Sequence, residues 1–432
     1  MAEYIKIRQM KDFIGKEVVI KGWLAGKRSS GKIAFLQLRD GSGFIQAVLE
    51  KSSTSEEKFL KVKEITQESS IEVTGIVKEE EKAPMGFELT ILDFKIMSLS
   101  LDYPITNKEH GTDFLMDERH LWIRHRRPFA TLKIRSRITK AARDFFDNRG
   151  FTLIESPIIT PSSCEGTSNL FKIDYFGNEA YLSQTGQLYA EAAAMAFGLV
   201  YTFGPTFRAE KSKTRRHLNE FWMLEPEMAF FTHEDNLVLQ EELIEYIVTE
   251  VLNNCTYELK LLNRDLEELK KIKAPFPRLR YSEAIELLKE KGFEDIQWGD
   301  DFGAPHEIFL SEQFEGKPVF ITHYPKAIKA FYMEIDDVDP RCVKCADLLY
   351  PGFGEIIGGS ERINNLEVLE ERIKEEKLPE GIYDWYVDLR KYGTVPHSGF
   401  GLGIERLVSV ITGIEHIREA ITFPRTLTRM KP

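Results

Sequence analysis

The chain has 432 residues, 42% hydrophobic and 29% charged, a balance typical of a globular protein large enough to form two domains. No stretch approaches the ~18 consecutive apolar residues of a membrane span, and the start lacks the apolar region of a secretory signal. The four cysteines fit a reducing compartment, so we expect a cytoplasmic protein without a membrane partner. A net charge of −11 does not exclude nucleic acid as a partner, because local basic clusters matter more than the sum.

The first hundred residues predict short strands separated by turns, with a tight turn at Asp40-Gly41-Ser42-Gly43. Five strands within about 80 residues predict a small closed barrel such as an OB-fold, and we assign residues 1–100 to it. That fold often binds single-stranded nucleic acid through aromatic stacking and a basic groove, although a barrel without a ligand is the alternative. Basic residues of the region cluster at Lys27, Arg28 and Lys32.

The next segment, residues 101–119, is charged and lacks periodicity, which predicts a linker or hinge. Residues 120–432 alternate between helical and strand-like patterns and predict an α+β domain with an antiparallel sheet. Amphipathic helices are expected at Thr131–Arg149, 187–197, 234–253, 281–291, 366–377 and 402–412. Strands are expected around Pro157 and at 200–203, 219–230, 318–322 and 327–334.

Three separated segments of this domain stand out. The first is the helix and strand that end at Pro157. The second runs from Phe207-Arg208-Ala209-Glu210 through a basic loop to Glu220-Phe221-Trp222, and the third is Gly399-Phe400-Gly401-Leu402-Gly403-Ile404-Glu405-Arg406. Each alone is a weak signal, but their order and content resemble motifs 1, 2 and 3 of the class II aminoacyl-tRNA synthetases. The resemblance covers almost the whole chain and is greatest to the aspartyl/asparaginyl subgroup.

This resemblance implies an N-terminal five-stranded OB-fold barrel that binds the anticodon, and a catalytic domain with an antiparallel sheet flanked by helices. It implies a homodimer with motif 1 at the interface. In the reaction, an amino-acid carboxylate attacks the α-phosphate of ATP, and the tRNA then takes the aminoacyl group. Neither step needs a nucleophilic side chain, so catalysis rests on alignment and on cations that absorb charge at the phosphate.

The resemblance also assigns the residues that bind ATP. Arg208 would bridge the α-phosphate and the amino-acid carboxylate, since its planar fork suits two oxygens. Glu210 would accept a hydrogen bond from the adenine amino group. Phe221 and Arg406 would sandwich the adenine ring, and Arg208 and Arg406 are the expected catalytic residues. The alternatives are a core role for Phe221 and a helix-surface role for Arg406.

Carboxylates in the same domain match magnesium ligands of the family. Glu355 is the first, and Asp347 the second; paired carboxylates are the hard ligands that Mg²⁺ takes beside nucleotide phosphates. The spacing from Asp347 to Glu355 is one residue longer than in the aspartyl pattern, and a solvent-facing acid is the alternative for Asp347. His217 would approach the γ-phosphate, although an exposed loop histidine without a ligand is an equal alternative. The Cys342-x-x-Cys345 pair offers too few ligands for a structural zinc site, and we expect no role for it.

The amino acid would be bound by four residues. Glu165 lies in a mobile loop of the family and, with Gln187, would bind the substrate ammonium, while Arg362 would meet the substrate side chain. Aspartyl enzymes carry a lysine where this chain has Ala190, and an aspartate where it has Glu225. The missing cation and the longer acid favour asparagine, because Glu225 would accept from an amide and repel a carboxylate. The alternative for Glu225 is a scaffold role as the ion-pair partner of Arg362.

In the barrel, Phe35 and Gln46 match positions that stack on and hydrogen-bond to the central anticodon base, and Arg28 would contact the RNA. A core role is the alternative for Phe35. The expected function is therefore that of an asparagine–tRNA ligase with ATP, Mg²⁺, asparagine and tRNA(Asn) as cofactors and partners. Its rivals are an aspartyl-tRNA synthetase, a related ATP-dependent asparagine synthetase, and a catalytically inactive RNA-binding relative. The intact barrel counts against the second, and the joint presence of Arg208, Glu210, Glu355 and Arg406 counts against the third.

Overall fold

The computed structural model describes residues 2–81, 83, 85–162, 164, 169–212 and 214–432. By its contacts the chain divides into two compact units, Met1–His125 and Arg126–Pro432. We call them the N-terminal and the C-terminal unit. The expected domain boundaries at residues 100 and 119 remain predictions.

The N-terminal unit is built on one sheet, in which each of the strands β2 to β6 pairs with two others of the set. The order runs β2-β3-β4-β6-β5, and β5 pairs again with β2, as expected for the five-stranded barrel. The two-residue β1 adds to β2 in parallel and escaped the sequence prediction. The strands are β1 Glu3–Tyr4, β2 Glu17–Ser30, β3 Ile33–Arg39, β4 Phe44–Glu50, β5 Ser70–Glu79 and β6 Phe87–Ser98.

Strand β3 shows why these residues form a barrel. Ala34, Leu36 and Leu38 are fully buried in its core, whereas the alternate Phe35 points to the outer face and stays half-buried. The helical elements are η1 Ile7–Phe13, η2 Lys51–Ser53, α1 Glu56–Glu64, α2 Thr112–Asp117 and α3 Arg119–Trp122. The last two lie in or beside the expected linker, where Ile105, Met116 and Trp122 bury one another in a small cluster.

The C-terminal unit contains an eight-stranded sheet in the order β13-β14-β15-β16-β17-β12-β11-β7. Its neighbours are antiparallel except at the two edges, where β13 and β14, and β7 and β11, run parallel. The strands are β7 Thr152–Leu153, β11 Leu199–Phe207, β12 Glu220–Ala229, β13 Arg278–Arg280, β14 Val319–Thr322, β15 Cys345–Tyr350, β16 Gly354–Glu361 and β17 His397–Gly403. A small sheet joins β8 Ile159–Thr160, β10 Asn178–Leu182 and β9 Lys172–Tyr175. The expected antiparallel α+β fold is confirmed.

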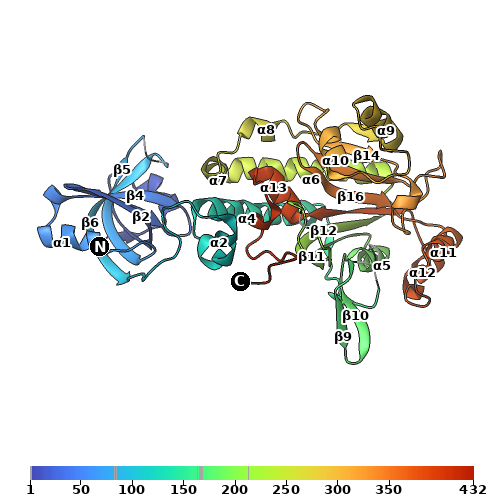
Figure 1. The fold of residues 1–432 in the computed structure, drawn as a ribbon, viewed down its shortest axis with the longest axis horizontal. Coiled ribbons are helices and arrows are strands. Elements are labelled where there is room, and N and C mark those ends of the chain that lie inside the picture. Colours follow the sequence, from blue (N-terminus) through green and yellow to red (C-terminus); the bar gives the residue numbers. More distant parts are fainter. Residues whose placement is uncertain (1, 82, 84, 163, 165–168, 213) are drawn as a thin grey trace. The chain divides into compact units, whose positions relative to one another are not determined.

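Helices cover both faces of the large sheet (Figure 1). On one face α4, α6 and α13 pack against alternate residues of β12 such as Leu224 and Met228, and α5 packs on the other face against β11 and β12. The helices are α4 Arg126–Asp147, α5 Gln187–Phe197, α6 His233–Asn254, α7 Thr256–Leu261, α8 Leu266–Lys270, α9 Tyr281–Glu290, α10 Ala304–Ser311, α11 Leu366–Glu375, α12 Asp384–Lys391 and α13 Ile404–Thr412. Short 3₁₀ turns are η4 Lys326–Ile328 and η5 Ile417–Glu419. Among the described residues, no helix has the length and apolar content needed to cross a membrane.

One predicted strand is wrong. Residues 327–334 form η4 and a loop that touches the sheet by a single bridge, between Met333 and Arg362. The consecutive Phe331 and Tyr332 are both buried, in a cluster with α11 and α12. Because successive strand residues point to opposite faces, burying both on the same side requires a loop.

Candidate active site

The face of the sheet opposite α6 is kept open by the residue pattern of β12 and β17. Leu224 of β12 and Phe400 of β17 point into the helical core, so their neighbours point to the open face. Glycine occupies the facing positions of β17. A side chain at Gly401 would begin 2.4 Å from the Met223 methyl carbon, and one at Gly399 would meet the Glu227 carboxylate. Glycines therefore leave room for the β12 side chains on this face.

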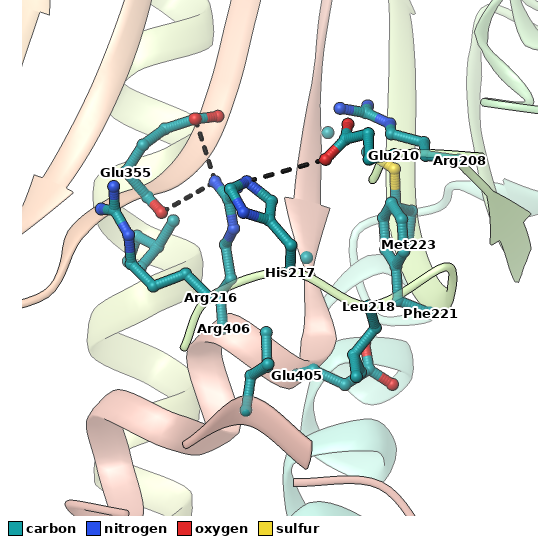
Figure 2. A pocket seen from close by; sticks show the side chains of 14 residues that line it. Arg208, Glu210, Arg216, His217, Leu218, Phe221, Met223, Glu355, Glu405 and Arg406 are labelled. Carbon is teal, nitrogen blue, oxygen red and sulfur yellow. Dashed lines mark hydrogen bonds and ion pairs between the residues drawn. The ribbon is translucent and has the colours of Figure 1, made fainter. Parts of the chain in front are cut away.

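A pocket on this face brings together the sequence-predicted ATP residues (Figure 2). They come from the loop after β11, from β12, from β16 and from α13. The residues that the pocket shares with the prediction are Arg208, Glu210, His217, Phe221, Glu355 and Arg406. Segments up to 200 residues apart in sequence thus form one cavity.

The loop after β11 is held by its own backbone. The Arg208 N–H donates to the Asn219 carbonyl at 3.0 Å, and the Asn219 side-chain amide donates back to the carbonyls of Arg208 and Glu210 at 2.8 and 3.0 Å. The guanidinium of Arg208 lies 5.5 Å from the centre of the Phe221 ring. This clasp fixes the start of the motif 2 loop at the mouth of the pocket.

Charged groups line the pocket wall. Arg406 donates to the Glu355 carboxylate at 2.9 Å and to its carbonyl at 3.0 Å. Burial raises the pKa of Glu355, but Arg406 and Lys329 outweigh it and hold the pKa at about 2. His217 lies 3.8 Å from Glu210, and burial together with Arg406 lowers the pKa of this histidine. The wall therefore offers a carboxylate and arginines, together with an aromatic ring.

Arg216 also lines this pocket, and in the sequence it stood out only as part of a basic run. Its guanidinium donates to the Glu307 carboxylate and to the Phe353 carbonyl, both at 2.7 Å. Glu307 on α10 also accepts from the Glu355 backbone N–H at 3.3 Å. The far end of the motif 2 loop is thus tied to the strand that carries Glu355.

The two predicted magnesium ligands face one another from adjacent strands. A Cβ placed on Gly358 would lie 3.3 Å from a Glu355 carboxylate oxygen and 3.4 Å from one of Asp347, so both carboxylates approach the same point. Asp347 also accepts from the Lys329 ammonium at 2.7 Å. Burial, together with the neighbouring Glu355, raises the pKa of Asp347 to about 6. This pair of hard oxygen donors fits a divalent cation.

Beyond the ATP residues, the same face carries a buried cluster around Arg362. Its guanidinium donates to Glu227 at 2.5 and 3.2 Å and to the Ser360 hydroxyl at 2.6 Å. Burial and the nearby Glu191 and Glu225 raise the pKa of Glu227, while Arg362 opposes them. Glu227 was missed in the sequence, although it lies two residues after Glu225 and so on the same strand face.

Glu225 is buried beside this cluster and is held by three donors. It accepts from the hydroxyl of Thr185, from the Gly186 backbone N–H at 2.9 Å and from the Thr202 hydroxyl at 3.2 Å. These donors fix the position of its carboxylate. Gln187, at the start of α5, is buried as well, and the fourth predicted amino-acid ligand, Glu165, lies outside the described residues.

In the N-terminal unit, the three predicted RNA ligands lie together on one barrel face. Arg28 stacks over Phe35 at 4.6 Å across strands β2 and β3, and its guanidinium donates to Gln46 on β4 at 3.2 Å. The neighbouring Lys27 does not belong to this basic surface. Its ammonium donates to the carbonyls of Val62, Lys63 and Ile65 at the end of α1 and satisfies that helix terminus.

An open sheet face with a charged, arginine-lined pocket, joined in one chain to an OB-type barrel, defines a nucleotide-using enzyme with an RNA-binding module. The model of the class II tRNA synthetases (D, K and N) matches residues 111–427, and that of the OB-fold nucleic acid binding domain matches residues 18–97. The chain belongs to the class II tRNA synthetases of this D, K and N group.

Solved structures of particular synthetases are similar over the whole chain. The asparaginyl-tRNA synthetase of Pyrococcus horikoshii, complexed with asparaginyl-adenylate, is 43% identical with a TM-score of 0.94, and 100% of each chain is covered. The asparaginyl-tRNA synthetase of Entamoeba histolytica is 34% identical with a TM-score of 0.91 and the same coverage. A putative aspartyl-tRNA synthetase from Leishmania major is 26% identical with a TM-score of 0.86, covering 100% of this chain and 95% of the other.

Proposed function

We propose that this chain is an asparagine–tRNA ligase. It activates asparagine with ATP to asparaginyl-adenylate and transfers the amino acid to the 3′ end of tRNA(Asn), releasing AMP and pyrophosphate. The proposal is supported by a buried donor, Arg362, and a buried acceptor held in place by its own donors, Glu225, on the same sheet face as the ATP residues. The similar archaeal and amoebal synthetases, which include adenylate complexes, are asparaginyl enzymes.

In activation, an oxygen of the asparagine carboxylate attacks the α-phosphorus of ATP, and pyrophosphate leaves with the bonding electrons. Arg208 bridges the two anions and absorbs the charge that builds on the phosphate. Phe221 and Arg406 hold the adenine ring from its two faces, and Glu210 accepts from its amino group. His217 lies at the end of the pocket that receives the terminal phosphate.

Asparagine and aspartate have nearly the same shape, so the choice between them rests on charge and hydrogen-bond direction. Arg362 donates to the side-chain oxygen of either. Glu225 accepts from the amide nitrogen of asparagine and repels the second oxygen of aspartate. Ala190, one turn after Gln187 on α5, supplies no cation to offset that repulsion.

In this proposal Glu355 and Asp347 would hold Mg²⁺ at the ATP site. When bound, it neutralises phosphate charge. Glu355→Gln and Asp347→Asn should therefore each raise the Mg²⁺ concentration needed for half-maximal activity. An unchanged magnesium titration in both variants would remove these residues from the metal site.

The remaining partners follow the same scheme. The face of Arg28, Phe35 and Gln46 reads the anticodon of tRNA(Asn), and the enzyme works in the cytoplasm as a homodimer. The resemblance places motif 1 at the dimer interface, and just after it Ile158 and Ile159 are each 45% exposed, so they are apolar side chains that a second copy would cover. Light scattering in solution should give the mass of two chains, and a monomer at micromolar concentration would remove the dimer from the proposal.

The decisive assay is ATP–pyrophosphate exchange with asparagine and aspartate, measured side by side on the wild-type chain. Exchange supported by asparagine alone is expected. Comparable exchange with aspartate would assign the chain to the aspartyl branch, and the absence of exchange with either would return it to the inactive RNA-binding alternative.

A further inference from the structure

Glu191 of α5 is a buried carboxylate that the activation scheme above does not use. It is fully buried and lies one helical turn after Gln187. One of its oxygens accepts from the Gln187 side-chain amide at 3.1 Å. The other accepts from Arg390 at 2.9 Å and from His397 at 3.0 Å, and the Tyr386 hydroxyl contacts both oxygens, at 2.9 and 2.7 Å.

Glu191 decides which way the Gln187 amide points. An ionised carboxylate only accepts hydrogen bonds, so the amide nitrogen of Gln187 must face it. The amide oxygen is then turned to the opposite side. Within the described part of the chain, that oxygen has no hydrogen bond, so it is left as an acceptor for a donor that arrives with the substrate.

The partners of Glu191 keep it charged and immobile. Arg390 is anchored to the Ile363 carbonyl at 2.8 Å, and the second ring nitrogen of His397 lies 2.8 Å from the Val395 carbonyl. Arg390 comes from α12 and His397 from β17. Segments some 200 residues further along the chain therefore fix the direction of one amide on α5.

We infer that Glu191 is a positioning residue for the α-ammonium of the substrate amino acid and acts through Gln187. The inference rests on the proposed function and on the role that the resemblance implies for Gln187, whose amide oxygen binds that ammonium. Glu191 also lies 4.0 Å from Arg362, so a competing possibility is that it acts on the substrate side chain instead. The two possibilities are separable, because they concern different ends of the substrate.

Glu191→Gln is the sharpest variant. Arg390 and His397 donate to the same oxygen of residue 191, so they should hold the new carbonyl oxygen in that place. The new amide nitrogen then faces Gln187 and forces its amide to flip, which turns an NH₂ group toward the substrate ammonium. Glu191→Asp keeps the charge, but its shorter side chain moves the carboxylate away from Gln187. It is the second variant to measure if Glu191→Gln does not fold.

The test compares asparagine with succinamic acid, which is asparagine without its α-amino group, in pyrophosphate exchange. In Glu191→Gln the KM for asparagine should rise about ten- to hundredfold, the scale of one lost charge-assisted hydrogen bond. The inhibition constant of succinamic acid and the KM for ATP should stay unchanged. Glu191→Asp should show the same split with a smaller rise.

Tyr386→Phe is the matched control, because it removes the hydroxyl that contacts both oxygens of Glu191 and leaves Gln187, Arg390 and His397 in contact with it; the asparagine KM should hardly change. If succinamic acid weakens in parallel with asparagine, or if neither changes, the positioning role is overturned. If the wild-type chain activates aspartate instead, the proposed function fails, yet aspartate and succinic acid measured in the same way still decide the role of Glu191.

Discussion

The site has two halves, the ATP pocket around Arg406 and Glu355 and the amino-acid cluster around Arg362 and Glu227. They differ in how far their charged side chains are paired and shielded from water. In the ATP half, the side chains of Arg406 and Glu355 are 22% and 35% exposed. In the amino-acid half, those of Arg362 and Glu227 are 2% and 0% exposed and pair at 2.5 Å. Both halves lie on the same sheet face and carry the same types of residue.

The difference follows from what each half must recognise. ATP brings several negative charges and a large ring, so partly solvated arginines and one aromatic ring can bind it. Asparagine differs from aspartate by one group, and only donors and acceptors of fixed direction can tell these apart. Such direction requires buried, fully hydrogen-bonded networks, in which loss of one member leaves a buried charge without compensation.

The largest effect that the comparison predicts is on stability. Glu227→Ala should lower the free energy of unfolding by ~3–5 kcal/mol, because Arg362 loses its buried acceptor. Glu210→Ala, in the ATP half, should change it by less than ~1 kcal/mol, since its ion pair is partly exposed. Urea titration followed by circular dichroism measures both. Equal losses would erase the distinction between the halves.

Arg208→Ala should invert that result. It should slow pyrophosphate exchange, because the transition state loses ~2–4 kcal/mol of stabilisation, the scale expected for one preorganised donor. The fold should stay stable. Lys211→Ala removes an exposed cation from the same loop and should leave exchange nearly normal. Near-normal exchange by a folded Arg208→Ala would mean that this arginine does not bridge the substrates.

The barrel face with Arg28, Phe35 and Gln46 is a third surface to compare, and its side chains are partly exposed like those of the ATP half. Phe35→Ala should weaken charging of tRNA(Asn) by ~1–3 kcal/mol, the value of one stacked base, and leave asparagine activation unchanged. Tyr4→Ala, which removes an exposed aromatic ring from β1, is the control. A parallel loss of activation and charging would show that Phe35 supports the fold instead.

The sequence predicted which residues gather in the pocket because most of them lie in short, contiguous motifs in the loop after β11, on β12 and on α13, and their binding of ATP stays a prediction. It predicted the amino-acid half only in part, since Glu191, Arg390 and His397 come from three segments with no local signal. Glu227 was within reach through the two-residue period of β12. Lys27 could not be excluded from the RNA surface without the structure, because only the fold shows that α1 ends beside it.

Glu225→Gln tests most directly whether the enzyme chooses asparagine over aspartate by charge. Pyrophosphate exchange with asparagine and aspartate should be measured on the wild type and on this variant. An unpaired buried charge costs ~3–5 kcal/mol, so the wild type should prefer asparagine by roughly a thousandfold at ~1.4 kcal/mol per decade. The variant, which no longer repels a carboxylate, should lose most of that preference. Equal wild-type rates with the two amino acids, or a preference that Glu225→Gln leaves intact, would contradict the account.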